Sequence, residues 1–152
     1  VVDVLDAALG ATETFNPQEA PANKRMIEVG SSRVNGNLSY ALRIFGRPPR
    51  TTACDCERTM DPALPQTLFR MTDTAILTKL RLPTGRIGSL VKSKRSDEEI
   101  FEEMFLASLS RFPSDDEKSA FQKHKTKSSD RPSMFVDVMW ALINTREFVL
   151  NH

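Results

Sequence analysis

The architecture of this chain depends most on the run Phe135-Val136-Asp137-Val138-Met139-Trp140-Ala141-Leu142-Ile143. Every side chain in this run except Asp137 is apolar, so a helix formed here is apolar nearly all round. Such a helix is buried in the centre of a protein instead of lying on its surface. Asp130, followed by Arg131-Pro132, is a suitable helix start, because aspartate caps free amides and proline fits the first turn. The run therefore predicts a central helix with other helices packed around it.

Two capping boxes predict the helices that precede this run. In Ser96-Asp97-Glu98-Glu99, and again in Ser114-Asp115-Asp116-Glu117, the serine oxygen and the glutamate three residues later can satisfy free backbone amides reciprocally. After the central run, Asn144-Thr145-Arg146-Glu147 is expected to start a last short helix. Apolar residues at helical spacing follow the two capping boxes and form the expected core: Ile100, Met104, Phe105, Leu109, Ala120 and Phe121. The last short helix bears Phe148 and Leu150.

The first half of the chain carries shorter helical patterns. Pro65 is typical of a first helical turn and Asp73 of a helix cap, and Pro83-Thr84-Gly85 indicates a break. Residues 25–29 favour one short strand. At the N-terminus, four apolar residues share one helical face before Gly10, which suits a helix end: Val2, Leu5, Ala8 and Leu9.

These patterns predict an all-α or mainly α fold, an orthogonal multi-helix bundle with long irregular loops and at most one short strand or hairpin. No heptad pattern persists, so a coiled coil is not expected. The 152 residues suit a single domain over 1–152. The chain opens with Val1-Val2-Asp3-Val4-Leu5-Asp6, which is neither a start methionine nor a signal peptide. We therefore expect the C-terminal fragment of a longer polypeptide.

Composition argues against two classes of partner. The formal net charge is +1, whereas a dedicated nucleic-acid surface makes a domain strongly basic. The basic runs Lys92-Ser93-Lys94-Arg95 and Lys123-His124-Lys125-Thr126-Lys127 contain no aromatic residue, so solvated helix ends are expected there. No run approaches the roughly 18 apolar residues that a membrane span needs. We expect neither nucleic-acid binding nor a membrane span.

Cys54 and Cys56, the only cysteines, leave three interpretations open. They can be structural thiols. They can form a labile disulfide or redox pair, because a bond between them would close a very small ring. They can also contribute to a metal or cofactor contact, for which only His124 and His152 are available as histidine ligands. The Cys-x-x-Cys-His signature of covalent haem is absent, so no cofactor is expected in this chain itself.

The loop around these cysteines carries Arg47, Arg50 and Arg58 together with Asp55 and Glu57. Planar guanidinium groups suit an anion or carboxylate site. The same residues suit an ion-pair network that fixes an irregular loop. A hydrolase with Asp55 or Glu57 as acid or base is a further alternative, which requires a cleft. Histidine is scarce and no nucleophile–base spacing is present, so no catalytic residue is predicted and we favour a non-enzymatic role.

Five ordered stretches resemble a known family. They are Phe45-Gly46-Arg47-Pro48, Cys54-Asp55-Cys56-Glu57-Arg58, Pro65-Gln66-Thr67-Leu68, Phe105-Leu106-Ala107-Ser108-Leu109-Ser110-Arg111-Phe112-Pro113 and Trp140-Ala141-Leu142-Ile143-Asn144-Thr145-Arg146-Glu147-Phe148-Val149-Leu150-Asn151-His152. In this order they resemble the C-terminal part of a planctomycete-type domain of unknown function (family fifteen fifty-three). The resemblance spans nearly the whole chain and is weakest over residues 11–36.

The resemblance implies a context and no reaction. Such domains close large exported proteins that are associated with a cytochrome-like segment, so the chain is expected to be exported or periplasmic. Its partners would be other domains of the same polypeptide, one of which could carry haem, and an oxidising compartment would favour a disulfide. The leading expectation is a non-catalytic structural or interaction module. The alternatives are a thiol redox or metal/cofactor-contact site serving the cytochrome-like neighbour, and a hydrolase using loop carboxylates.

Overall fold

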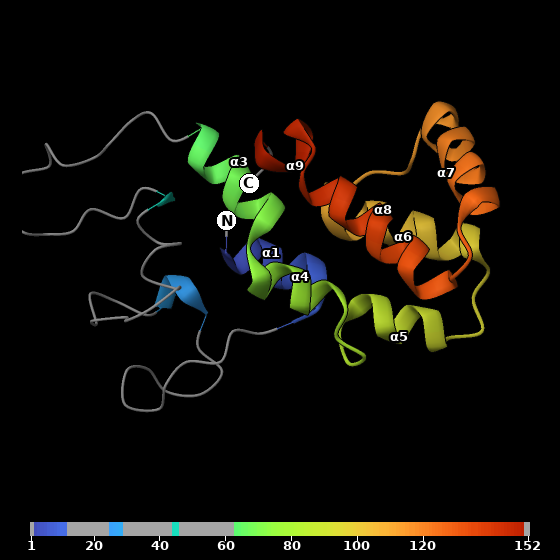
Figure 1. Ribbon diagram of the computed structural model, residues 1–152, viewed down its shortest axis with the longest axis horizontal. Coiled ribbons are helices and arrows are strands. Elements are labelled where there is room, and N and C mark those ends of the chain that lie inside the picture. Colours follow the sequence, from blue (N-terminus) through green and yellow to red (C-terminus); the bar gives the residue numbers. More distant parts are fainter. Residues whose placement is uncertain (1, 12–24, 29–43, 46–62, 151–152) are drawn as a thin grey trace, which may run out of the picture.

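The computed structural model describes residues 2–11, 25–28, 44–45 and 63–150 (Figure 1). Over these residues the chain forms eight α-helices, one 3-10 helix (η1) and no strand. Their bounds are α1 Val2–Leu9, η1 Met26–Glu28, α3 Ala63–Thr72, α4 Thr74–Leu80, α5 Arg86–Lys92, α6 Asp97–Leu109, α7 Asp115–Lys127, α8 Arg131–Ile143 and α9 Arg146–Leu150. The prediction of a multi-helix bundle is confirmed.

Helix α8 occupies the centre of the bundle, as its apolar sequence predicts. It contacts α4, α5, α6, α7 and α9, and Figure 1 shows it running across the middle of that group. The side chains of Phe135, Met139 and Ile143 are 0% exposed. A helix that is apolar nearly all round can reach this burial only with helices on several sides.

The predicted helix starts are confirmed by their hydrogen bonds. Ser96 Oγ and Ser114 Oγ accept from the amides of the glutamates three residues later, at 3.2 and 3.3 Å. The two glutamate carboxylates accept in return from the serine amides, at 2.8 and 2.7 Å. Asp73 and Asp130 accept from amides in the first turns of α4 and α8. Gly10 follows α1 with φ +61°, the left-handed conformation that glycine adopts without strain.

The short strand expected over residues 25–29 is wrong for the part that the structure describes. Met26–Glu28 forms a 3-10 turn, in which the Glu28 amide donates to the Arg25 carbonyl at 2.9 Å. The Asp3 carboxylate in α1 accepts from the amides of Met26 and Ile27, at 2.5 and 2.9 Å. A carboxylate thereby satisfies amides that a strand would have paired with a neighbouring strand.

Arg86, at the start of α5, secures the end of α1. Its Nε donates to the Ala8 carbonyl at 2.8 Å and its Nη2 to the Ala7 carbonyl at 3.0 Å. These carbonyls lie in the last turn of α1, beyond the regular hydrogen bonds of the helix, and the Ala7 carbonyl also accepts from the Gly10 amide at 3.4 Å. A Cβ placed at Gly10 would lie 3.0 Å from the Arg86 amide nitrogen, so this close contact also favours glycine there.

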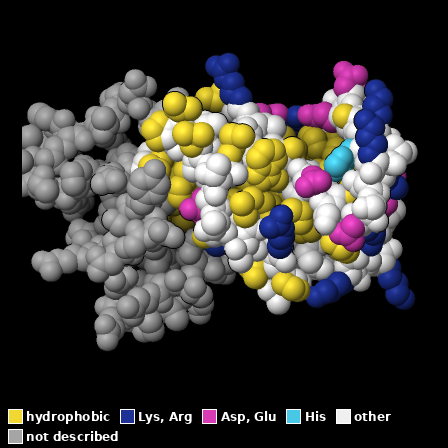
Figure 2. Space-filling model, in the orientation of Figure 1, with side chains coloured by type: hydrophobic (Ala, Val, Ile, Leu, Met, Phe, Trp, Pro, Cys, Tyr) yellow, Lys and Arg dark blue, Asp and Glu magenta, His cyan; other side chains and the backbone are white. Residues whose placement is uncertain are grey.

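The surface divides into an apolar and a charged region. Figure 2 shows apolar side chains gathered over α3, α8 and α9 on one face, and charged side chains around the end formed by α5 and α7. On α3, Leu64, Leu68 and Met71 are 68%, 51% and 39% exposed. Within the described parts of the chain, no helix is both long and apolar enough to cross a membrane.

The central position of α8 predicts a large loss of stability when its core is emptied. Replacing Phe135 with alanine should lower the free energy of unfolding by about 3–5 kcal/mol, because a fully buried ring is removed and a cavity remains. Phe112→Ala removes a ring that is 64% exposed and should cost less than about 1 kcal/mol. Urea denaturation of both variants compares the two losses. Equal losses would contradict the central placement of α8.

Candidate functional site

The loop residues singled out by the sequence lie outside the described residues. This applies to Cys54 and Cys56, to the ion-pair candidates Arg47, Arg50, Asp55, Glu57 and Arg58, and to His152. Among the residues that are described, no group of three or more histidine, cysteine or acidic side chains is arranged to hold a metal ion. His124 is described, and it contributes to a different feature.

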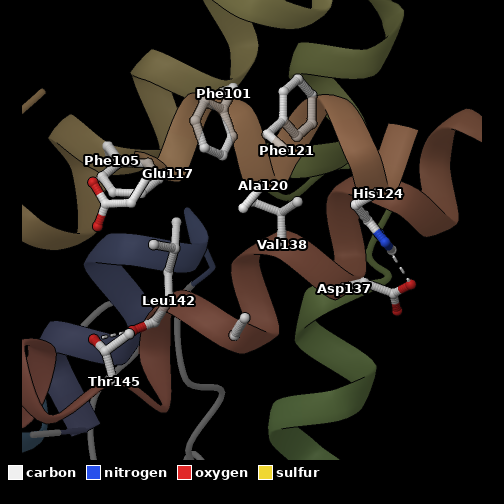
Figure 3. Close-up of a pocket in the computed structure, with 11 residues that line it drawn as sticks. Phe101, Phe105, Glu117, Ala120, Phe121, His124, Asp137, Val138, Leu142 and Thr145 are labelled. Atoms are coloured by element: carbon white, nitrogen blue, oxygen red, sulfur yellow. Dashed lines mark hydrogen bonds and ion pairs between the residues drawn. The ribbon is translucent and has the colours of Figure 1, made fainter. Parts of the chain in front are cut away.

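That feature is an apolar groove of about 370 Å³ between α7 and α8, with α6 as its floor. Figure 3 shows the rings of Phe101, Phe105 and Phe121 along one side of the groove, with Val138 and Leu142 of α8 facing them. The lining is mainly apolar. The side chains that form it are Phe101, Phe105, Glu117, Ala120, Phe121, His124, Asp137, Val138, Ala141, Leu142 and Thr145.

The groove exists because α7 contributes little to the core. Phe121 is the one buried side chain of α7, which is described over its whole length. Its ring stacks on that of Phe101, with centroids 4.3 Å apart and an interplanar angle of 12°. The next positions toward the groove are small and exposed, namely Ala120 on α7 and Ala141 on α8, so the prediction that Ala120 points into the core is wrong. The walls are therefore low above the aromatic floor, whose rings are themselves at most 5% exposed.

One end of the groove is closed by a histidine and a carboxylate from opposite walls. His124 Nε2 lies 3.6 Å from Asp137 Oδ2, and Figure 3 shows the two side chains facing each other. Ser128 Oγ lies 3.5 Å from the same histidine nitrogen. The side chains of His124 and Asp137 are 38% and 65% exposed, so this end remains in contact with water.

The other end is fixed by Arg111, in the turn after α6. Its guanidinium binds Glu117 with two hydrogen bonds, at 2.7 and 2.8 Å, and Glu147 with two more, at 2.7 and 2.8 Å. It also donates to the Phe112 carbonyl at 3.0 Å and lies 5.2 Å from the centre of the Phe105 ring. We call Arg111, Glu117 and Glu147 the arginine clamp. The clamp joins the end of α6 to the starts of α7 and α9.

The clamp changes the proton affinity of its carboxylates. The paired hydrogen bonds from Arg111, assisted by those from Ser114, lower the pKa of Glu117 to about 2. The bonds from Arg111 also lower the pKa of Glu147, while both carboxylates raise the pKa of Arg111. Bidentate pairs between a guanidinium and a carboxylate are among the strongest charge-assisted hydrogen bonds. All three groups therefore remain charged near neutral pH.

The lysines of α7 that pair with α6 lie on the side away from the groove. Lys118 Nζ is 3.3 Å from Glu102 Oε1. Lys125 Nζ is 2.9 Å from Asp97 Oδ2 and 3.2 Å from Glu98 Oε1. These pairs hold α7 against α6, and none of these side chains lines the groove.

Two of the polar groups in the groove are already engaged by neighbouring groups. The one hydroxyl of the groove, Thr145 Oγ1, donates to the Leu142 carbonyl at 2.7 Å and accepts from the Phe148 amide at 3.2 Å. The carboxylate of Glu117 is engaged by Arg111 and Ser114. Both groups thus serve the local backbone or the clamp, while aromatic and aliphatic side chains form most of the surface. Ligand sites commonly combine such a lining with a few polar groups at the edge.

Sequence reasoning missed the arginine clamp and the pairing of His124 with Asp137. A signal for the clamp was present, since Arg111 and Glu147 lie in two of the stretches that carry the family resemblance. Arg111 also stands between a helix end and a capping box that already engages Glu117. The sequence therefore singled out the segments that contain Arg111, Glu117 and Glu147, but it did not predict the contact between them.

The chain matches no protein-family model, no curated protein and no solved structure. The resemblance to a planctomycete-type domain therefore stays a prediction, and the arguments that follow depend on the geometry of the groove and the clamp.

The low pKa of Glu117 predicts a specific pH dependence of stability. Its pKa is about 2 in the folded chain against an ordinary value of 4.5. The stabilisation of the fold by the ionised Glu117 carboxylate is therefore complete above about pH 4.5 and is lost as the pH falls toward about 2. Glu117→Gln should be less stable than the unmodified chain at neutral pH, and the difference should shrink across this interval. Urea denaturation at several pH values measures this difference in the free energy of unfolding. A difference that stays constant down to about pH 2 would contradict the role of the clamp.

Proposed function

We propose that this chain is a non-catalytic interaction module that binds an apolar segment of a protein partner in the groove between α7 and α8. The observation that carries the proposal is the groove itself, with its aromatic floor and its two polar ends. The partner proposed here is another domain of the same polypeptide, in agreement with the resemblance to C-terminal domains of exported multidomain proteins.

The shape of the groove supports a protein segment as its occupant. Two walls formed by helices, with apolar side chains between them, are the setting in which an amphipathic helix is recognised. Ala120 and Ala141 keep the walls low, so the backbone of an incoming helix can approach closely. An apolar side chain transferred from water to the floor of Phe101 and Phe105 would contribute about 1.5–3 kcal/mol.

The alternatives based on the cysteine loop remain sequence predictions. A redox or metal contact at Cys54 and Cys56, and a hydrolase using Asp55 or Glu57, both depend on residues outside the described parts of the chain. No described contact favours either of them, so neither becomes a second proposal.

The test is a titration of the isotope-labelled chain with a hydrocarbon-stapled helical peptide that presents leucines on one face and has glutamine at both ends. We expect chemical-shift changes at Ala120, His124, Val138 and Ala141. Ala141→Trp places an indole in the groove and should weaken binding at least about tenfold. Ala75→Trp, on an exposed position of α4, is the matched control and should bind as the unmodified chain does.

Two results would contradict the proposal. One is the absence of peptide binding to the groove at any accessible concentration. The other is binding of the neutral small molecule 1-N-phenylnaphthylamine in the groove without binding of the helix, which would make the groove a small-molecule site.

A further inference from the structure

We infer that the occupant of the groove is an amphipathic helix of about two turns that carries a basic residue at each end. The inference rests on the proposed function, because it specifies the partner of the same groove. Three features of the described residues carry it: the length of the groove, the charge at its ends and the absence of free donors on Arg111.

The length of the groove matches two helical turns. Along α8 its lining runs from Asp137 to Leu142, five helical steps or about 7.5 Å, and Thr145 continues it beyond the helix end at Ile143. Along α7 it runs from Glu117 to His124, seven helical steps or about 10.5 Å. Side chains seven residues apart on an incoming helix span the same distance and lie on one face. Residues at these two positions would reach the two ends of the groove together.

The Asp137 end presents an exposed carboxylate beside the His124 ring. Asp137 is 65% exposed and its single described ionic contact is the 3.6 Å approach of the histidine. A carboxylate has several acceptor positions, so it can still accept a hydrogen bond from an ammonium or guanidinium group. This end therefore favours a basic side chain on the occupant.

The clamp end has the same sign, because two carboxylates share one guanidinium. Arg111 offers five N–H donors, and they serve Glu117, Glu147 and the Phe112 carbonyl. No donor remains for an acidic group on a partner. Glu147, with 37% of its side chain exposed, remains open to a further donor from solvent or from a partner. An acidic flank would meet repulsion here, and a basic flank would meet attraction.

The lysines of α7 do not cancel this preference. Lys118 and Lys125 pair with carboxylates of α6 and lie away from the groove. Lys123 and Lys127 are exposed, but neither belongs to the lining. The titratable groups that line the two ends of the groove are thus Glu117 at the clamp end, and Asp137 beside His124 at the other end.

The test compares three stapled helices with the same apolar face and with lysine, glutamine or glutamate at both ends. The lysine peptide should bind roughly tenfold more tightly than the glutamine peptide, as two exposed ion pairs allow, and the glutamate peptide should bind more weakly still. The preference should shrink in about 1 M salt, where exposed charges are screened within about 3 Å.

Asp137→Asn is the variant that isolates one end of the groove. It should reduce the preference for lysine over glutamine about threefold. Asp115→Asn is the matched control, since Asp115 is exposed and lies on the far side of α7 from the groove. This control should keep the full preference for the lysine peptide over the glutamine peptide. Amide spectra of both variants establish that each remains folded.

The outcomes separate the inference from the proposed function. Equal affinity for the lysine and glutamine peptides, with shifts at the groove, would overturn the inference and leave the interaction module in place. No binding of any peptide would overturn both. Self-association of the chain that Ala141→Trp abolishes would assign the groove to a second copy and would also overturn the inference.

Discussion

A single guanidinium, that of Arg111, binds the carboxylates at the starts of two helices and stands over the ring of Phe105. Its two hydrogen bonds to Glu147 join segments that are 36 residues apart in sequence, and its two to Glu117 span six residues. The end of α6, the start of α7 and the start of α9 meet at this group. The orientation of α7, and with it the groove, depends on that meeting.

The need for the clamp follows from the composition of α7. Phe121 is its one buried side chain, whereas α6 buries six residues. A helix with so little apolar burial gains most of its stability from contacts at its ends and along its polar face. The clamp, the two capping-box bonds and the lysine pairs with α6 supply these contacts. None of these contacts covers the side of α7 that faces α8, and the groove lies there.

The two walls of the groove are held by different kinds of contact. Helix α8 is fixed on several sides by fully buried residues. Helix α7 is held by Phe121 in the core and otherwise by polar contacts that are weaker individually than core packing.

The sequence predicted the features that depend on neighbours close in the chain. The capping boxes at Ser96 and Ser114, the Asp130 cap and the buried run of α8 follow from residues within a few positions of one another, and all are confirmed. The strand over residues 25–29 was wrong because a distant carboxylate, that of Asp3, satisfies those amides.

The candidate site was not predicted, for the same physical reason. The pairing of Arg111 with Glu147 and of His124 with Asp137 joins side chains from different helices, and a groove is defined only by the packing of three helices. Single-sequence patterns do not report such distances. The cysteine loop, which attracted attention through its composition, lies outside the described residues.

The central claim is that the arginine clamp holds α7 in place while the core around α8 stands independently. Hydrogen exchange of the Arg111→Lys variant tests it most directly, with Arg146→Lys on the exposed part of α9 as the control. Lysine keeps the charge but cannot form the paired bonds. We expect amides of α7 to exchange at least about tenfold faster, while those of α8 stay as protected as in the control. Equal acceleration in both helices, or none in α7, would contradict the account.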